Sequence, residues 1–180
     1  MKWVLLCGLS VILGCRQPGK LTEATAPTTA AAVASVEPRV SAEPVDVSVT
    51  ADATTIYPGA TIDVLVVFDI APTYEIHARH APPPAIATKL GLGLAAGFDA
   101  IGDWSEPTTV RSQWPDGHPV HAGRATFSQK VRVSSDVKPG QYPLSCRVFY
   151  QACNDRYCLP PVKLQVLGSL TVASPAASPR

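Results

Sequence analysis

Six segments of the chain alternate apolar and polar residues or carry short β-branched runs, which is the pattern of β-strands. Proline, glycine and aspartate bound most of these segments, as they do at turns between strands. Pro-Gly pairs at residues 58–59 and 139–140 predict turns before the second and fifth segments. The six predicted strands cover residues 45–51, 61–70, 74–80, 125–134, 142–152 and 162–172.

No segment shows a convincing amphipathic helical period. Residues 85–96 come closest, but glycines at 91 and 93 weaken a helix there. Residues 97–123 are interpreted as an irregular loop with at most short strands, and a loop of this length in a compact domain is often functional. About seven strands in about 130 residues predict an all-β fold, an immunoglobulin-like antiparallel β-sandwich.

The first 14 residues have the composition of a signal peptide, with Lys2 followed by an apolar run too short to span a bilayer. The run ends in Ile-Leu-Gly-Cys at residues 12–15, which resembles the lipobox of bacterial lipoproteins. That resemblance implies a lipid anchor on Cys15. The alternative is an ordinary cleaved signal that ends near a cysteine. Both interpretations place the mature chain outside the cytoplasm, in the periplasm.

Composition divides the remainder of the chain. Residues 15–43 are rich in Ala, Thr, Pro and Ser and predict a flexible tether, because they cannot bury enough apolar surface to offset chain entropy. Residues 174–180 predict a disordered tail. One domain is therefore expected over residues 44–173. A net charge of +1 without a basic cluster in the sequence argues against nucleic-acid binding.

The predicted domain contains three cysteines, Cys146, Cys153 and Cys158. Cys146 shares the more apolar face of its strand and predicts a buried, inert thiol; it lies about 23 Å along the strand from Cys153, beyond disulfide reach. If residues 154–157 form a hairpin turn, Cys153 faces Cys158 at a Cα separation of about 4.5–5.5 Å, which suits a disulfide. The same register places Cys146 opposite Gln165.

Such a disulfide is either a structural staple or a working redox pair. Closing so short a loop stabilises a protein by only about 2 kcal/mol. Strand alternation places Cys153 on the outward face, and Pro160-Pro161 cannot donate ladder hydrogen bonds, which predicts a sheet edge. The nearby Arg156 would favour a released thiolate. Structural disulfides in short loops are nevertheless common in exported proteins, so spacing alone leaves both interpretations open.

The stretch YQACNDRYCLPP, residues 150–161, resembles the active-site hairpin of the N-terminal periplasmic domain of DsbD-type thiol:disulfide interchange proteins. The resemblance combines both cysteines with Tyr150, Gln151 and the two prolines at fixed offsets, and extends loosely over residues 45–172. It implies a redox-active Cys153–Cys158 disulfide, with Cys158 as the site of the mixed disulfide. The turn here holds four residues, whereas better-known members have five.

The resemblance also implies a cap and partners. The family shields its disulfide with an aromatic residue of a cap loop, for which Trp104 beside Asp103 is the candidate; Tyr74 and His77 would lie near the pair. Without the family, Trp104 and Trp114 would be interpreted as packing residues. Electrons would come from a membrane thiol reductase or a thioredoxin-like domain and pass to exported thiol proteins, with no cofactor.

Other functions remain as alternatives. The pairs His77/His80 and His118/His121 suggest copper or zinc and a role in copper or cytochrome maturation. Residues three apart on a strand face opposite sides, so only His118 and His121, in a loop, could share an ion; no metal site is predicted. The other alternative is a non-catalytic binding or scaffolding β-sandwich with a structural disulfide. Nothing resembles a Ser-His-Asp set, a phosphate-binding loop or a paired-carboxylate site.

Overall fold

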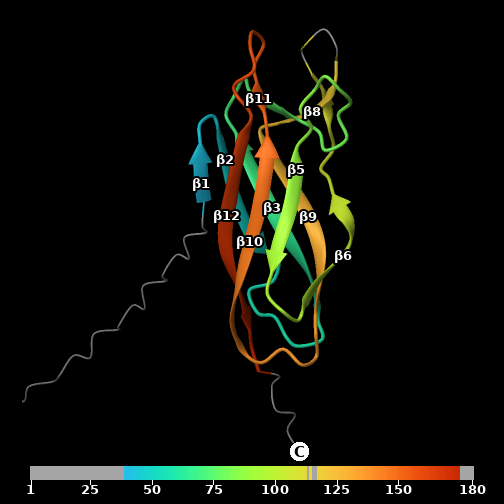
Figure 1. The fold of residues 1–180 in the computed structure, drawn as a ribbon, viewed down its shortest axis with the longest axis vertical. Coiled ribbons are helices and arrows are strands. Elements are labelled where there is room, and N and C mark those ends of the chain that lie inside the picture. Colours follow the sequence, from blue (N-terminus) through green and yellow to red (C-terminus); the bar gives the residue numbers. More distant parts are fainter. Residues whose placement is uncertain (1–38, 113, 115–116, 175–180) are drawn as a thin grey trace, which may run out of the picture. The chain divides into compact units, whose positions relative to one another are not determined.

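The structure, a computed structural model, describes residues 39–112, 114 and 117–174. These residues form antiparallel β-strands and no helix, so none of them belongs to a helix that could cross a membrane (Figure 1). One sheet has the order β1-β2-β3-β9-β6, a second β12-β10-β5, and a small third β11-β4-β8-β7. The predicted all-β sandwich is confirmed.

The strand bounds follow the sheets. The first sheet contains β1 (Arg39–Ala42), β2 (Val45–Ala51), β3 (Thr61–Ile70), β9 (Arg124–Val133) and β6 (Phe98–Ser105). The second contains β12 (Val162–Val172), β10 (Gly140–Tyr150) and β5 (Lys89–Leu94). The third contains β11 (Ala152–Cys153), β4 (Glu75–His77), β8 (Pro119–Ala122) and β7 (Val110–Arg111).

The core lies between the first two sheets and is built from the inward residues of alternating strands. On β3, Val64, Val66 and Phe68 are fully buried, while on β10 the buried positions recur at every second residue up to Tyr150. The rings of Phe68 and Tyr150 meet edge to face, with centroids 5.7 Å apart. This contact joins the two sheets close to the end of β10, where the cysteine hairpin begins.

The predicted domain start at Pro44 is wrong by one strand. β1 pairs with β2 from Arg39↔Ser48 to Ala42↔Val45, inside the segment that composition assigned to the tether. This short strand lacks an apolar pattern of its own, and its ladder to β2 stabilises it. The predicted signal peptide, Cys15 and residues 16–38 lie outside the described residues, as do residues 175–180 of the predicted tail.

Two further strands were not predicted. Residues 85–96, where no convincing helix was found, contain the strand β5, which pairs with β10. The predicted loop 97–123 contains the eight-residue strand β6, which pairs with β9. β6 lies at the edge of its sheet and only Phe98 of its residues is buried, so it lacks the apolar alternation that marks a strand in sequence.

The predicted register of Cys146 is wrong by one residue, since it faces Val166 instead of Gln165. At the tip of the hairpin, Leu159 donates its backbone N–H to Ala152, whereas further down Tyr150 pairs with Val162. Two residues, Pro160 and Pro161, therefore stand opposite one, Gln151. This two-to-one arrangement is a β-bulge, and proline is tolerated there because the bulged residues make no ladder bonds.

The disulfide hairpin

A four-residue turn brings the two cysteines together. The backbone N–H of Asn154 donates to the carbonyl of Tyr157 at 3.0 Å, and the Asn154 side-chain oxygen accepts from the N–H groups of Arg156 and Tyr157 at 2.9 and 3.0 Å. An asparagine that satisfies the backbone donors of the following residues stabilises a tight turn. Asn154 thus organises the turn from its first position.

Cys153 and Cys158 form a disulfide, with Cα atoms 4.0 Å apart. They are also antiparallel bridge partners, as the hairpin interpretation predicted. The motif residues around them have structural roles: Tyr150 anchors the hairpin in the core, and the Gln151 amide donates to the Leu159 carbonyl at 2.9 Å across the bulge. The motif therefore specifies the shape of the hairpin as well as the sulfur chemistry.

The two sulfur-bearing residues differ in exposure. Cys158 is exposed, but Cys153 is only 1% exposed, so the prediction that Cys153 faces outward to solvent is wrong. After Tyr150 the chain leaves the β10–β12 ladder, and β11 pairs with β4, with Cys153 opposite Glu75. Alternation along β10 therefore does not set the exposure of Cys153, because Cys153 belongs to a different sheet. A solvent-borne thiol meets Cys158 and not Cys153.

Ser112 and Trp114, which follow β7, connect the turn between the cysteines to β4. The Ser112 hydroxyl donates to the Glu75 carboxylate, and the backbone N–H of Trp114 donates to Ser112 Oγ at 3.0 Å. The indole N–H of Trp114 donates to the carbonyl of Asn154 at 2.6 Å, directly beside Cys153. Glu75 and Ser112 are both buried. These contacts link the turn between the cysteines to β4, the neighbour of β11.

Trp114 is thus the tryptophan that contacts the hairpin. The described contacts of the predicted cap, Trp104, are with the core and with Arg79, whose guanidinium donates to its carbonyl at 3.4 Å. Asp103 is exposed on β6. Ser105 pairs with Ser128 in the middle of β9, away from the hairpin end of the sheet. The role of Asp103 and Trp104 as a shield stays a prediction without a described contact to the disulfide.

Tyr74 contacts the turn between the cysteines. Its hydroxyl is 3.3 Å from that of Tyr157, inside the turn between the cysteines. This hydrogen bond, followed by burial, raises the pKa of Tyr74 above its ordinary value. Tyr74, Glu75, Trp114 and Asn154 line part of a small cavity of about 100 Å³ next to the hairpin. Tyr157 is exposed, so this aromatic pair belongs to the accessible surface.

His77 is buried two residues beyond Glu75 on β4, and its ring lies 6.2 Å from that of His118 in an edge-to-face arrangement. His121 binds Glu106, with Nε2 2.9 Å from Oε1, and the same oxygen accepts the backbone N–H of Arg79 at 2.7 Å. His118 and His121 therefore have different neighbours. Within the described residues no group of three or more His, Cys, Asp or Glu could hold a metal ion.

Cys146 behaves as predicted. It is fully buried with a free thiol, and burial raises its pKa to about 11 from an ordinary value of 9.0. A thiol reacts as its thiolate, so this cysteine is inert at neutral pH. The chemistry of the site therefore rests on one disulfide with one accessible sulfur.

Sequence reasoning missed three contributors to the site: Glu75, Ser112 and Trp114. Glu75 stood inside a predicted strand, but its pairing with β11 depends on where that strand docks. Trp114 was visible only as one of two tryptophans in the long middle region. These three residues have in common only that they lie near the hairpin in space, and the sequence pattern does not reveal that.

The fold and the site together define a class: an all-β sandwich whose disulfide hairpin offers one sulfur to solvent. No protein-family model matches the chain, and no curated protein matches it. Similar solved structures include two DsbD-type N-terminal domains. The N-terminal periplasmic domain of ScsB from Proteus mirabilis is 15% identical with a TM-score of 0.49, over 71% of this chain and 49% of that one.

The N-terminal domain of DsbD from Neisseria meningitidis, in the reduced form, is 21% identical with a TM-score of 0.42, over 69% of this chain and 85% of that one. A type I cohesin of ScaB from Pseudobacteroides cellulosolvens is 14% identical with a TM-score of 0.43, over 73% of this chain and 95% of that one. The chain thus covers about half of the ScsB domain. At these values the function has to be argued from the site itself.

Proposed function

We propose that the chain is an extracytoplasmic thiol:disulfide exchange protein of the DsbD N-terminal type. In this role it takes electrons from a membrane thiol reductase or its thioredoxin-like domain and passes them to exported thiol proteins. The signal sequence motivates the location, and the lipobox motivates attachment to a membrane through Cys15.

The observation that carries the proposal is the unequal exposure of the two cysteines. Thiol–disulfide exchange proceeds by attack of a thiolate on one sulfur, and access decides which sulfur is attacked. Cys158 is exposed while Cys153 is buried, so attack is directed to Cys158. A staple would need no such asymmetry, and a loop with a sequence separation of 5 stabilises the fold only by about 2 kcal/mol.

The exchange balances in two steps. A thiolate of the donor attacks Sγ of Cys158, which forms a mixed disulfide, breaks the Cys153–Cys158 bond and releases Cys153 as a thiolate that takes up a proton. The donor's second thiolate then attacks the donor sulfur of the mixed disulfide. This attack releases Cys158 as a thiolate and leaves the donor with a disulfide of its own. The reduced pair repeats these steps in reverse on an oxidised acceptor, so two electrons pass from donor to acceptor.

The first experiment is a measurement of the reduction potential against glutathione or dithiothreitol buffers. We expect a value above about −300 mV, because structural disulfides of exported proteins lie below that value. A potential in the structural range would favour the non-catalytic binding sandwich instead.

The second experiment traps the mixed disulfide in the native cell envelope. Cys153→Ser leaves Cys158 as a single exposed thiol, and we expect a covalent adduct with a thiol protein that reductant releases. The matched control, Cys158→Ser, leaves the enclosed Cys153 and should capture far less. Equal capture by both variants, or by neither, contradicts directed attack at Cys158.

A further inference from the structure

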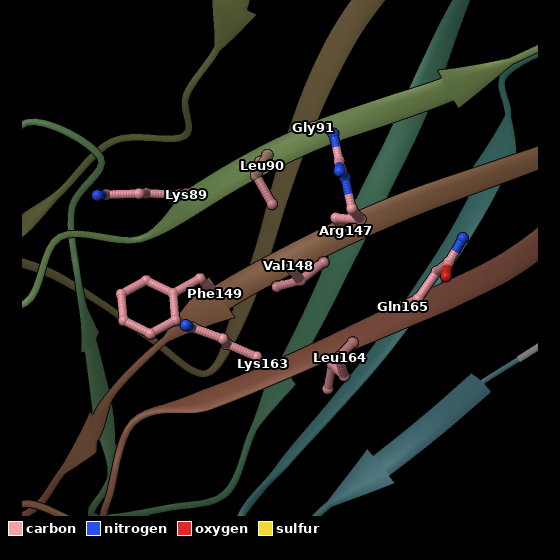
Figure 2. A pocket seen from close by; sticks show the side chains of 9 residues that line it. All are labelled: Lys89, Leu90, Gly91, Arg147, Val148, Phe149, Lys163, Leu164 and Gln165. Carbon is pink, nitrogen blue, oxygen red and sulfur yellow. The ribbon is translucent and has the colours of Figure 1, made fainter.

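A row of cationic and aromatic side chains crosses the outward face of the β12-β10-β5 sheet. Phe149 on β10 pairs with Lys163 on β12 and with Lys89 on β5. The two ammonium nitrogens lie 5.6 and 5.9 Å from the centroid of the Phe149 ring, within the range of cation–π attraction. Arg147 precedes Phe149 by two positions and lies on the same face of β10. We call these four residues the cationic face (Figure 2).

The cationic face is not neutralised by its surroundings. Lys89, Arg147 and Lys163 are exposed, and in the described part of the chain none of them pairs with a carboxylate. The register shows that no outward residue of β5, β10 or β12 is acidic. An open groove of about 480 Å³ runs over this face, and a Cβ on Gly91 at its floor would meet no atom within 4 Å. The face is therefore complementary to a negative surface.

The cationic face lies at the end of β10 that leads into the cysteine hairpin. Phe149 is the last residue but one of β10, and Cys153 follows it by four positions. Four strand positions are about 13 Å. A protein interface of standard size covers about 800 Å² on each partner, equivalent to a disc about 16 Å in radius. The Cα atoms of Cys153 and Cys158 are 4.0 Å apart, so an interface of this size that includes Cys158 can also include the lysines beside Phe149.

We propose that the cationic face is the docking surface for an acidic patch that borders the reactive cysteine of the partner protein, an inference that rests on the proposed exchange function. Complementary charge raises the rate of productive encounter and sets the orientation of docking. A membrane of anionic lipids has matching charge too, and binding of this face to lipid vesicles is the competing outcome of the test.

The test uses the full chain with Cys15→Ala and three synthetic peptides in which one cysteine is flanked by glutamates, glutamines or lysines. The variant is Lys89→Gln with Lys163→Gln, and the control is Arg132→Gln with Lys138→Gln, which changes the net charge equally at exposed positions outside the face. In about 0.01 M salt, where the Debye length is about 30 Å, the glutamate peptide should reduce the wild-type disulfide about tenfold faster than the glutamine peptide.

This advantage should disappear in the Lys89→Gln/Lys163→Gln variant and in about 1 M salt, while the control variant keeps it. Dithiothreitol attacks as a thiolate with a single negative charge and no glutamates, so its rate should differ between the variants far less than that of the glutamate peptide. The proposal is overturned if the glutamate peptide has no advantage, if the control variant loses it equally, or if vesicles containing phosphatidylglycerol bind the wild type through the two lysines and the peptide does not.

A second measurement separates docking from exchange. A glutamate peptide with serine in place of cysteine should bind the wild type more tightly than the variant, by the same factor of about ten. Binding without any exchange of the cysteine peptide would support the docking surface and remove the proposed redox function. If all three cysteine peptides exchange at equal rates and the serine peptide does not bind, the redox function is supported and the docking surface is removed.

Discussion

Reduction of the Cys153–Cys158 disulfide should weaken the domain slightly and leave it folded. The sequence separation is 5, and in the chain-entropy model a loop of this size contributes about 2 kcal/mol. Domains of this kind have about 5–15 kcal/mol of stability, so the reduced form stays native at 25 °C. For about 130 residues, a loss of about 2 kcal/mol lowers Tm by about 7 °C.

The assay is urea unfolding followed by far-UV circular dichroism, with and without a phosphine reductant. The midpoint should fall while the m-value stays constant, because the surface exposed on unfolding hardly changes. A Cys153→Ala/Cys158→Ala variant serves as the control and should not respond to the reductant, since Cys146 carries a free thiol. A reduced domain that is unfolded in water would refute the reasoning. The bond would then be a staple, and a carrier must fold in both redox states.

Three further predictions concern the turn, the buried thiol and the Glu106 carboxylate, which accepts hydrogen bonds from Arg79 and His121. Asn154→Ala removes the side-chain acceptor of two turn N–H groups, which should make the disulfide easier to reduce in thiol buffers, because the turn holds the thiols together; Asp155→Ala, the exposed neighbour, should change the potential little. Cys146 has a raised pKa in the folded state, so the free energy of unfolding should fall between pH 9 and about pH 11, and urea titrations of Cys146→Ala should lack this fall. For Glu106, burial favours the neutral acid, but hydrogen bonds from Arg79 and His121 outweigh it and lower the pKa below 4.5. The free energy of unfolding that this carboxylate contributes should be lost as the pH falls through that lowered pKa. Acid titrations of Glu106→Gln should show a smaller loss of stability, and an equal loss would contradict a stabilising role of Glu106.

Several features of the fold followed from local pattern. The strands at residues 45–51, 61–70 and 162–172 have the predicted bounds because their inward positions alternate with polar ones. The disulfide and the buried Cys146 followed from hairpin geometry and strand alternation. In these cases neighbouring residues on one strand carry the information.

Features that depend on docking between strands were missed. The edge strand β6 has a single buried residue, so its pairing with β9 leaves no periodic trace. Cys153 lies in a different sheet from β10 because β11 pairs with β4, and the hydrogen bond from Trp114 to Asn154 joins residues forty positions apart in the chain.

The cationic face was invisible for the same reason. Lys89, Arg147 and Lys163 are far apart in a chain whose net charge is only +1, and no run of basic residues marks them. The antiparallel ladders of β10 with β5 and β12 bring them together. The net charge and the order of charged residues in the sequence therefore did not predict this cluster of positive side chains on the sheet.

The double proline limits how another chain can approach the disulfide. Many proteins recruit an extended peptide by adding it as a new strand to an exposed sheet edge, where backbone hydrogen bonds supply affinity for almost any sequence. Next to Cys158 the edge offers Pro160 and Pro161, which have no N–H to donate. An extended chain therefore gains few backbone hydrogen bonds beside the sulfur, and recognition of a partner there depends on its side chains.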